Sequence, residues 1–229
     1  MKRHLKAITV PKTWQIKRKG QKFVVRPLPS KNFKYSMPLA LVFKNILKYA
    51  KTNREIKTIL MDKEILIDGK RKKELKDLLG FMDILTITIT KENYRFLLNK
   101  YNKFVLIPVE DSEAKYKLVK IVGKKAQKKG KTQLNLFDSR NILTDKNDYK
   151  VGDSLKIELP SQKILDHYKL EEKAFVYVIS GKHSGEYGLI TKIKNNEFFI
   201  KTRDNEFIVD KDSIYVIGKE KSEIKLPEL

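Results

Sequence analysis

Positive charge is distributed very unevenly along this chain. The first 54 residues hold 15 lysines and arginines and no aspartate or glutamate. They carry +15 of the formal net charge of +22, which leaves +7 for the other 175 residues. A short run of charge is usually a solvated face, but so long an acid-free segment repels itself and stays extended unless a polyanion neutralises it. We therefore expect binding to nucleic acid or to an anionic membrane surface.

Composition narrows the class of protein further. The chain has 229 residues, enough for one large domain or a few small ones, and its 41% hydrophobic residues allow only modest cores. The absence of cysteine excludes disulfides and thiolate metal sites, which suits an intracellular protein. No apolar run approaches the roughly 18–20 residues that span a bilayer, and Ala7–Val10 is too short for the core of a signal peptide. We expect a soluble, intracellular protein.

Residues 1–36 are expected to form an extended basic arm. Pro11, Gly20, Pro27 and Pro29 interrupt any helix there. Aromatic residues are interleaved with the cations of this segment: Trp14, Phe23, Phe33 and Tyr35. These rings can stack on exposed bases while the cations hold phosphates, or they can anchor the arm on its own protein. The sequence leaves both possibilities open.

Two short helices are predicted after the arm. Pro38 suits the first turn of a helix, and apolar residues follow it at helical spacing as far as Ala50. A second, cationic face of this helix has offsets of four and three: Lys44, Lys48 and Lys51. A capping box at 52–55 starts the second helix. Its outward cations are Arg54 and Lys57.

The apolar period then changes from the helical one to two. Glu64–Asp68 is typical of a strand, Asp68–Gly69 of a tight turn, and Asp83–Thr90 of a further strand. The turn leads into a basic tip that includes Lys70, Arg71 and Lys72. Two neighbouring helices and a basic hairpin can form one concave RNA-binding surface.

From Tyr94 onward, strand signals alternate with turn signals. A series of short strands is predicted as far as Ile217, and their spacing suggests small β-barrels. The same part of the chain contains a second acid-free run, Lys115–Lys131, with eight lysines. Four of them are predicted to contact RNA: Lys124, Lys125, Lys128 and Lys129.

One loop between two predicted strands contains three glycines: Gly181, Gly185 and Gly188. Glycine permits positive φ angles and the close approach of a partner. Lys182 and His183 lie at the tip of this loop, where a lone histidine is more often solvated than bound to RNA. The segment is not a P-loop, because no Gly-Lys-Ser/Thr precedes a helix.

An ordered series of stretches runs through the chain: Lys2–Lys6, Pro11–Trp14, Pro38–Ala50, Ile67–Lys70, Gly80–Asp83, Gln133–Leu136, Arg140–Asn141, Gly152–Ser154, the loop at 181–188 and Val216–Lys219. Together they resemble one family, the archaeal and eukaryotic small-subunit ribosomal protein S-four of the e-type. Within that resemblance, the loop at 181–188 is similar to the family's KOW motif. The resemblance covers essentially the whole chain.

The resemblance implies an α+β, multidomain and mostly β fold. Its expected parts are an extended basic arm at 1–36, a small helix-helix-sheet RNA-binding module at 37–100, a central β-domain at 101–172, an SH3-like KOW barrel at 173–218 and a tail at 219–229. It also implies a structural constituent of the small ribosomal subunit, which binds and stabilises rRNA during assembly and translation in the cytoplasmic ribosome. The expected partners are small-subunit rRNA and neighbouring ribosomal proteins, with no membrane, no autonomous homo-oligomer, no cofactor and no metal.

Charge, loop position and resemblance together select the residues expected to bind RNA. They are Lys2, Arg3, His4, Lys6, Lys12, Trp14, Lys17, Arg18, Lys19, Arg26, Lys44, Lys48, Lys51, Arg54, Lys57, Lys70, Arg71, Lys72, Lys124, Lys125, Lys128, Lys129, Gly181, Lys182, His183, Gly185 and Gly188.

No catalytic constellation is expected. His4, His167 and His183 are dispersed, and neither Gly-x-Ser-x-Gly nor His-Glu-x-x-His occurs. An RNA-modifying enzyme with the same binding module stays open as an alternative, although it would need a separate catalytic domain. A KOW-type transcription factor is another, although it would leave the arm and the helices unexplained. Membrane attachment ranks lowest, because the arm lacks a continuous amphipathic helix.

Overall fold

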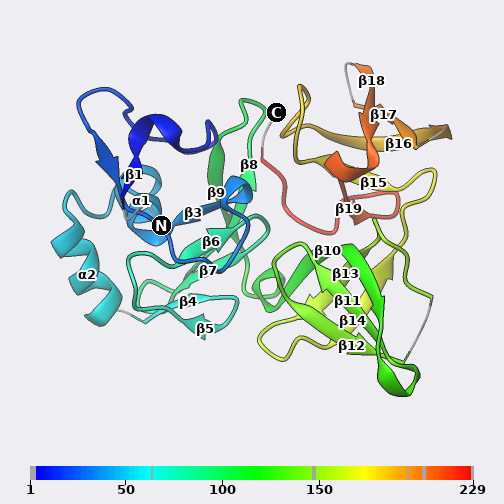
Figure 1. Ribbon diagram of the computed structural model, residues 1–229, viewed down its shortest axis with the longest axis horizontal. Helices are drawn as coiled ribbons and strands as arrows, with labels where there is room; N and C mark the ends of the chain where they lie inside the picture. Colours follow the sequence, from blue (N-terminus) through cyan, green and yellow to red (C-terminus); the bar gives the residue numbers. More distant parts are fainter. Residues whose placement is uncertain (1–3, 63, 146–147, 195, 203–204, 228–229) are drawn as a thin grey trace. The chain divides into compact units, whose positions relative to one another are not determined.

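The computed structural model describes residues 4–62, 64–145, 148–194, 196–202 and 205–227, with the side chain of Lys129 left out. The chain forms two compact units. The first comprises residues 1–98 with 102–114, and the second comprises residues 99–101 with 115–229. Among the described residues, strands predominate and the α-helices lie in the first unit (Figure 1). The prediction of a mostly β fold built from several parts is confirmed.

The N-terminal segment folds onto the first unit instead of projecting from it. β1 (Leu5–Lys6) pairs antiparallel with β2 (Phe23–Val24). Four of its apolar side chains are buried: Ala7, Val10, Trp14 and Val24. The expectation of an extended arm is therefore corrected. The prolines do prevent a long helix, but apolar side chains between the cations hold the segment against the folded unit.

Both predicted helices are present, but the first is shorter than predicted. α1 (Leu39–Leu41) continues into a π-helical turn at Val42–Ile46 and ends there. Lys48 has a φ of 58°, outside the helical region. The cationic stripe predicted for this helix is therefore wrong beyond Lys44. The second helix, α2 (Asn53–Asp62), is amphipathic, with Ile56 and Leu60 buried.

A five-stranded antiparallel sheet in the order β5-β4-β7-β8-β9 completes the first unit. Its strands are β4 (Ile65–Ile67), β5 (Lys70–Arg71), β7 (Ile84–Ile87), β8 (Glu92–Leu98) and β9 (Phe104–Val109). Asp68 and Gly69 join β4 to β5 with φ angles of 51° and 74°. Two positive φ angles are typical of a two-residue hairpin turn, so the predicted turn is confirmed. A second pair of short strands was not predicted: β3 (Ser36–Pro38) and β6 (Leu78–Gly80).

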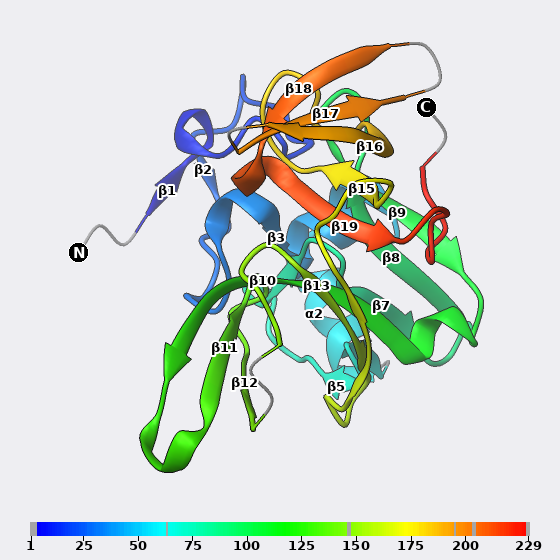
Figure 2. The same ribbon diagram turned by 90° about the vertical axis from the view of Figure 1, so that its right-hand side faces the viewer.

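The second unit contains two five-stranded antiparallel sheets. The first has the order β12-β11-β10-β13-β14, with strands β10 (Tyr116–Ala126), β11 (Thr132–Leu136), β12 (Asn141–Thr144), β13 (Ser154–Glu158) and β14 (Ile164–Tyr168). Its core is formed by Val119, Ile121, Leu134, Leu136, Tyr149, Leu155 and Ile157. β10 and β11 form a hairpin, seen at the lower left of Figure 2, and β12 pairs with β11 from Thr132 to Asn135. The edge strands β12 and β14 were missed because little of either is buried.

The second sheet of this unit has the order β18-β17-β16-β15-β19. Its strands are β15 (Phe175–Val178), β16 (Tyr187–Lys194), β17 (Glu197–Lys201), β18 (Glu206–Asp210) and β19 (Ile214–Gly218). Tyr215 ties the two sheets together: its hydroxyl donates to the Leu118 carbonyl at 2.8 Å and accepts from the Lys120 amide at 3.1 Å. Each described helix is too short or too polar to span a bilayer.

Candidate RNA interface

Exposed cations lie along the two helices of the first unit and the loop between them. They are Lys44, Lys48, Lys51, Arg54 and Lys57. On α2, burial of Ile56 and Leu60 turns the opposite face outward. Arg54 and Lys57 are three residues apart on that face, so they point to the same side of the helix. The loop cations reach the surface although they do not continue the first helix.

The start of α2 is fixed by a cap close to the predicted one. The Glu55 amide donates to the Thr52 hydroxyl oxygen at 3.3 Å. The Glu55 carboxylate accepts from that hydroxyl at 2.8 Å and from the Lys51 amide at 2.9 Å. The carboxylate therefore reaches one residue further back than in the usual capping box. The Lys51 amide and then the Thr52 hydroxyl lower the pKa of Glu55.

The basic hairpin lies beside α2. Arg71 donates from its guanidinium to the Met61 carbonyl in the last turn of that helix, at 3.3 Å. Lys70 and Arg71 are exposed, whereas Lys72 is half-buried and lies 3.6 Å from the Asp77 carboxylate. A cation is favourable at the carboxyl end of a helix. The predicted meeting of the second helix and the hairpin is thus present in the structure.

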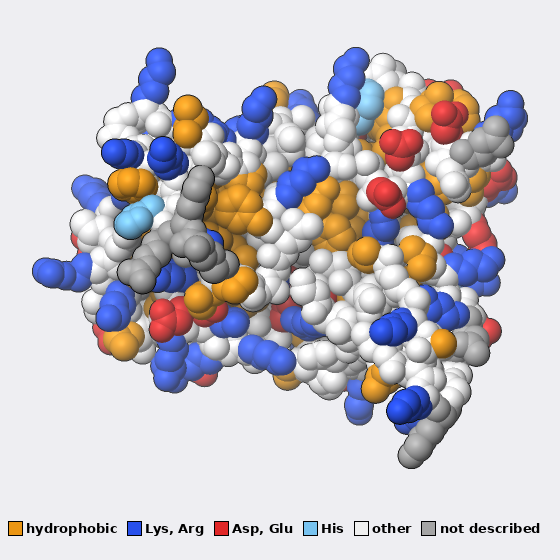
Figure 3. Space-filling model, in the orientation of Figure 1, with side chains coloured by type: hydrophobic (Ala, Val, Ile, Leu, Met, Phe, Trp, Pro, Cys, Tyr) orange, Lys and Arg blue, Asp and Glu red, His pale blue; other side chains and the backbone are white. Residues whose placement is uncertain are grey.

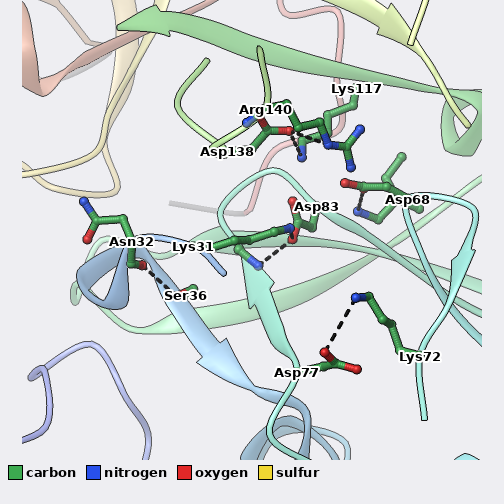
Figure 4. A network of polar contacts seen from close by, with 12 residues as sticks. Lys31, Asn32, Ser36, Asp68, Lys72, Asp77, Asp83, Lys117, Asp138 and Arg140 are labelled. Carbon is green, nitrogen blue, oxygen red and sulfur yellow. Dashed lines mark hydrogen bonds and ion pairs between the residues drawn. The ribbon is translucent and has the colours of Figure 1, made fainter. Parts of the chain in front are cut away.

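Two buried carboxylates hold the loops of this unit in place (Figure 4). The Asp83 carboxylate, which is 0% exposed, accepts from the Gly80 amide at 2.6 Å and pairs with the Lys31 ammonium. Asp68 accepts from the Ile84 amide at 3.0 Å, which links the hairpin turn to β7. Lys31 therefore has a structural contact, while Lys70 stays at the surface.

Some cations of the N-terminal segment are exposed, whereas Arg18 is bound to the segment's own backbone. Exposed ones are His4, Lys6, Lys12, Lys17 and Lys19, and Arg26 is half-buried. Arg18 donates from its guanidinium to the carbonyls of Ala7, Ile8, Val10 and Pro11 at 2.9–3.4 Å. The prediction that Arg18 binds RNA is corrected: its terminal nitrogens hold the segment's own backbone.

The prediction that Trp14 contacts RNA is also corrected. Its side chain is 1% exposed, its indole N–H donates to the Ser36 carbonyl at 2.8 Å, and its ring lies 5.1 Å from that of Phe33. A ring enclosed in this way cannot stack on a base, so of the two possibilities the anchoring role holds. Phe23 is the exception in the segment, since it is 43% exposed and lies beside His4.

The hairpin of β10 and β11 carries the second group of predicted lysines. Lys124, Lys125 and Lys128 are exposed. Lys124 also donates to the Tyr149 carbonyl at 3.3 Å. The side chain of Lys129 lies outside the described part of the chain, as do Lys2 and Arg3. Cationic side chains are visible over both units in the space-filling view, and acidic ones are frequent among them over β16–β18 (Figure 3).

The glycine loop between β15 and β16 is only partly available to a partner. Gly181 has a φ of 92° with open space around it, and Lys182 is exposed. A Cβ at Gly185 would lie 2.0 Å from the Asn99 carbonyl oxygen, and one at Gly188 would lie 2.3 Å from that of Lys201. The prediction that these two glycines contact RNA is corrected, because each makes room for the chain's own backbone.

His183 packs against its own sheet. Its ring stacks on Phe207, with the centroids 4.0 Å apart and the planes 3° from parallel. One ring nitrogen lies 3.3 Å from the Glu186 carboxylate. Its side chain is only 28% exposed, which favours a structural role over contact with RNA.

Three further cations are buried and make contacts within the protein. Lys117 pairs with Asp138 at 2.9 Å, and Arg95 pairs with Glu113 at 3.1 Å. Lys120 donates to two carbonyls of the turn before β19, at 2.9 and 3.0 Å. Burial lowers the pKa of Lys120 to about 8. The sequence alone gave no signal for these roles, since the partners lie far away along the chain.

The described residues show no group of three histidine, aspartate or glutamate side chains that could hold a metal ion. The lysine and arginine side chains exposed on both units can bind anions by charge and by N–H donation.

Two family models match the chain. The model for the Ribosomal family S4e matches residues 90–164, and the model for the RS4NT (NUC023) domain matches residues 1–29. The chain is 38% identical to the small ribosomal subunit protein eS4 of Methanothermobacter thermautotrophicus, over 99% of this chain and 96% of that protein. It is also 38% identical to eS4 of Methanocaldococcus jannaschii, over 98% of each.

A solved structure agrees with these relatives. The crystal structure of the 30S ribosomal protein S4e from Thermoplasma acidophilum has a TM-score of 0.72 and 30% identity, covering 81% of this chain and 96% of that one. The match to these eS4 proteins extends over nearly their full length. The chain belongs to the family of small ribosomal subunit protein eS4.

Proposed function

We propose that this protein is a structural constituent of the small ribosomal subunit, where it binds and stabilises small-subunit rRNA in the cytoplasm. The observation that carries the proposal is the near full-length match to proteins named as small ribosomal subunit protein eS4. The exposed cations of the first unit and of the β10–β11 hairpin support it, because they suit a phosphate backbone. Neither an RNA-modifying enzyme nor a transcription factor finds support among these relatives.

The contacts proposed for rRNA phosphates are exposed cations among those predicted from the sequence. They are Lys6, Lys12, Lys17, Lys19, Lys44, Lys48, Lys51, Arg54, Lys57, Lys70, Arg71, Lys125, Lys128 and Lys182. Each would replace condensed counterions on the RNA, and release of these ions supplies much of the affinity. The role is architectural, with no catalytic residue and no cofactor, and the other partners would be neighbouring ribosomal proteins.

We also propose how the chain divides into domains. The helices and sheet of residues 37–100 suit an RNA-binding module, and residues 173–218 suit an SH3-like KOW barrel. The glycine loop at 181–188 supports the latter, because it joins β15 to β16 within a five-stranded antiparallel sheet.

Sedimentation of a cell lysate tests the proposal, with the protein detected in each fraction. We expect it in the small-subunit and polysome fractions and its release by high salt, because screening weakens phosphate contacts. Purified protein should also bind a small-subunit rRNA transcript. Abundant native protein free of ribosomal particles and indifferent to the transcript would contradict the proposal.

A further inference from the structure

A row of amide side chains lies on the outward face of the β10–β11–β12 part of the second unit. Gln133 and Asn135 are two residues apart on β11, so they lie on one face, while Leu134 and Leu136 face the core. Asn141 of β12 lies directly opposite Asn135, and Lys125 of β10 lies directly opposite Gln133. Strand register alone therefore brings these side chains together.

Hydrogen bonds fix the amides in a chain. The Gln127 amide nitrogen donates to the Gln133 oxygen at 2.9 Å, and the Gln133 nitrogen donates to the Asn135 oxygen at 2.8 Å. A side-chain amide has two N–H donors and an oxygen with two lone pairs. Each bond in the chain uses one donor and one lone pair, so the row keeps donor and acceptor capacity in a fixed orientation. Gln127 and Asn141 are exposed.

Strand propensity does not account for the amides of this row. Asparagine is depleted in strands, yet two asparagines occupy directly opposed positions here. The position across from Asn135 on its other side is Gly123, which has no side chain to cover the amide. A Cβ there would lie 3.4 Å from the Asn135 nitrogen, in ordinary contact. Gly123 thus leaves one side of this half-buried amide uncovered.

The surroundings indicate what the amides bind. The row lies at the end of the run Lys115–Lys131, which holds eight lysines and no acid. Lysine holds phosphates of RNA and DNA alike, whereas the 2′-hydroxyl, both donor and acceptor, distinguishes RNA. An A-form helix displays 2′-hydroxyls and base edges in a wide, shallow minor groove. Exposed Leu143, opposite Gln133, adds an apolar contact to this face.

We propose that the amide row of Gln127, Gln133, Asn135 and Asn141 reads the minor groove of an rRNA helix while Lys125 and Lys128 hold the flanking phosphates. This inference rests on the proposed function and assigns one surface within it. Lysine contacts supply affinity for any polyanion, and the amides supply preference for RNA.

Competition between duplexes of the same sequence tests the amide row in the full-length protein. The probe is a small-subunit rRNA transcript, displaced by either an RNA duplex or a DNA duplex. We expect wild type to prefer the RNA duplex and Gln133→Val/Asn135→Val to lose roughly tenfold of that preference, because two hydrogen-bonding groups are removed. Valine suits strands, so the melting temperature should stay at the wild-type value or rise.

Two further variants separate the roles of charge and amide. Lys125→Gln/Lys128→Gln should weaken binding to both duplexes equally and leave the preference unchanged. Gly123→Thr leaves every amide in place but covers Asn135, and should reduce the preference without lowering the melting temperature.

The outcomes distinguish this inference from the proposed function. Wild type that binds the transcript without preferring RNA duplex overturns the inference alone, as does a Gln133→Val/Asn135→Val protein that keeps the preference. An equal loss for both duplexes in that variant also overturns it. Failure of wild type to bind the transcript at all would instead overturn the proposed function.

Discussion

Lys120 is a cation that the fold buries and binds to backbone carbonyls. Its side chain is 5% exposed, and its ammonium donates to the carbonyls of Lys211 and Asp212. Burial lowers its pKa to about 8, and the charge of Asp212 only partly opposes this. A charged group in such a place costs stability unless it is paired. The Lys120 ammonium holds the turn before β19 through these two hydrogen bonds.

The low pKa of Lys120 makes stability depend on pH. The unfolded lysine titrates near its ordinary value of 10.5 and the folded one near 8, so between these values the unfolded state binds more protons and the free energy of unfolding rises with pH. We expect a gain on the order of 2 kcal/mol from pH 7.5 to 9.5. Burial raises the pKa of Tyr168, whose unfolded form titrates near 10, so measurements should stop below that value.

Chemical denaturation across this pH range checks the expectation. Lys120→Met is the control, because it removes the titrating group and should remove most of the rise. A rise of equal size in the variant would show that other groups produce the pH dependence.

Trp14 is the one tryptophan of the chain, and it is enclosed. Trp14→Ala should lower the free energy of unfolding by about 3–5 kcal/mol, because it leaves a cavity. Trp14→Phe keeps most of the apolar area and should cost about 1–2 kcal/mol through the lost bond to the Ser36 carbonyl. Denaturation followed by circular dichroism measures both. Unchanged stability of Trp14→Ala together with weaker RNA binding would contradict the anchoring role.

At the scale of elements, α2 depends on a cap made from its own first turn. Thr52 and Glu55 bind each other, and Glu55 also accepts from the Lys51 amide. These contacts satisfy amides that a helix start leaves without partners. The cap therefore orders the helix that presents Arg54 and Lys57.

Removing this cap should destabilise the protein. Thr52→Ala is expected to lower the free energy of unfolding by about 1 kcal/mol, a typical value for a helix cap. Thr58→Ala on the same helix is a matched control, since the Thr58 hydroxyl donates within the helix, at 3.3 Å to the Arg54 carbonyl. Thermal denaturation of both variants measures the difference. An equal effect of the two changes would show that the cap itself contributes nothing.

The carboxylate of the cap adds a dependence on pH. The pKa of Glu55 is lowered in the folded state, first by the Lys51 amide. The stabilisation that the Glu55 carboxylate provides is therefore fully present above its ordinary pKa. It is lost as pH falls through the lowered pKa of the folded state. Glu55→Gln should be less stable than wild type at neutral pH, and the difference should shrink in acid. A difference that stays constant down to acid pH would contradict this account.

At the scale of the whole molecule, position decides what an exposed lysine does. The N-terminal segment has exposed lysines and no acid, whereas Lys194 and Lys201 lie directly opposite Glu197 and Glu206 in the second sheet. A cation with a carboxylate beside it has less free charge to offer a phosphate. The N-terminal lysines should therefore dominate the binding of RNA.

Two quadruple variants test this difference in RNA binding. Substitution to glutamine of Lys6, Lys12, Lys17 and Lys19 should reduce the slope of log affinity against log salt by about three, since each lost phosphate contact removes about 0.7–0.9. Substitution of Lys156, Lys169, Lys194 and Lys201, each of which lies beside or directly opposite a glutamate, should leave the slope within about one of wild type. Affinity for the rRNA transcript at several salt concentrations measures both, and equal slopes for the two variants would contradict the assignment.

Point substitutions test the N-terminal segment more cleanly than removal of residues 1–34 would. Val10 and Trp14 are buried in the first unit, so a truncation would remove core as well as charge. Changes in exposed lysines leave that core intact.

Features that depend on neighbouring residues could be predicted from the amino-acid sequence alone. The strand period, the Asp68–Gly69 turn and the cap at 52–55 are set by neighbouring residues, and each is present. The excess of cations and the lack of cysteine follow from composition in the same way. The resemblance to the eS4 family also came from ordered motifs, and the relatives confirm it.

Which cations stay free was decided only when the chain folded. Lys117 meets Asp138, Lys120 meets Lys211, and Arg18 closes on its own backbone carbonyls. Gly185 makes room for Asn99, and Gln133 lines up with Lys125 across a strand pair. Burial and pairing depend on residues that are distant along the chain, and a local pattern contains no information about which of them will meet. Sequence therefore determined the charge and most of the strands, and tertiary packing determined which charges stay exposed.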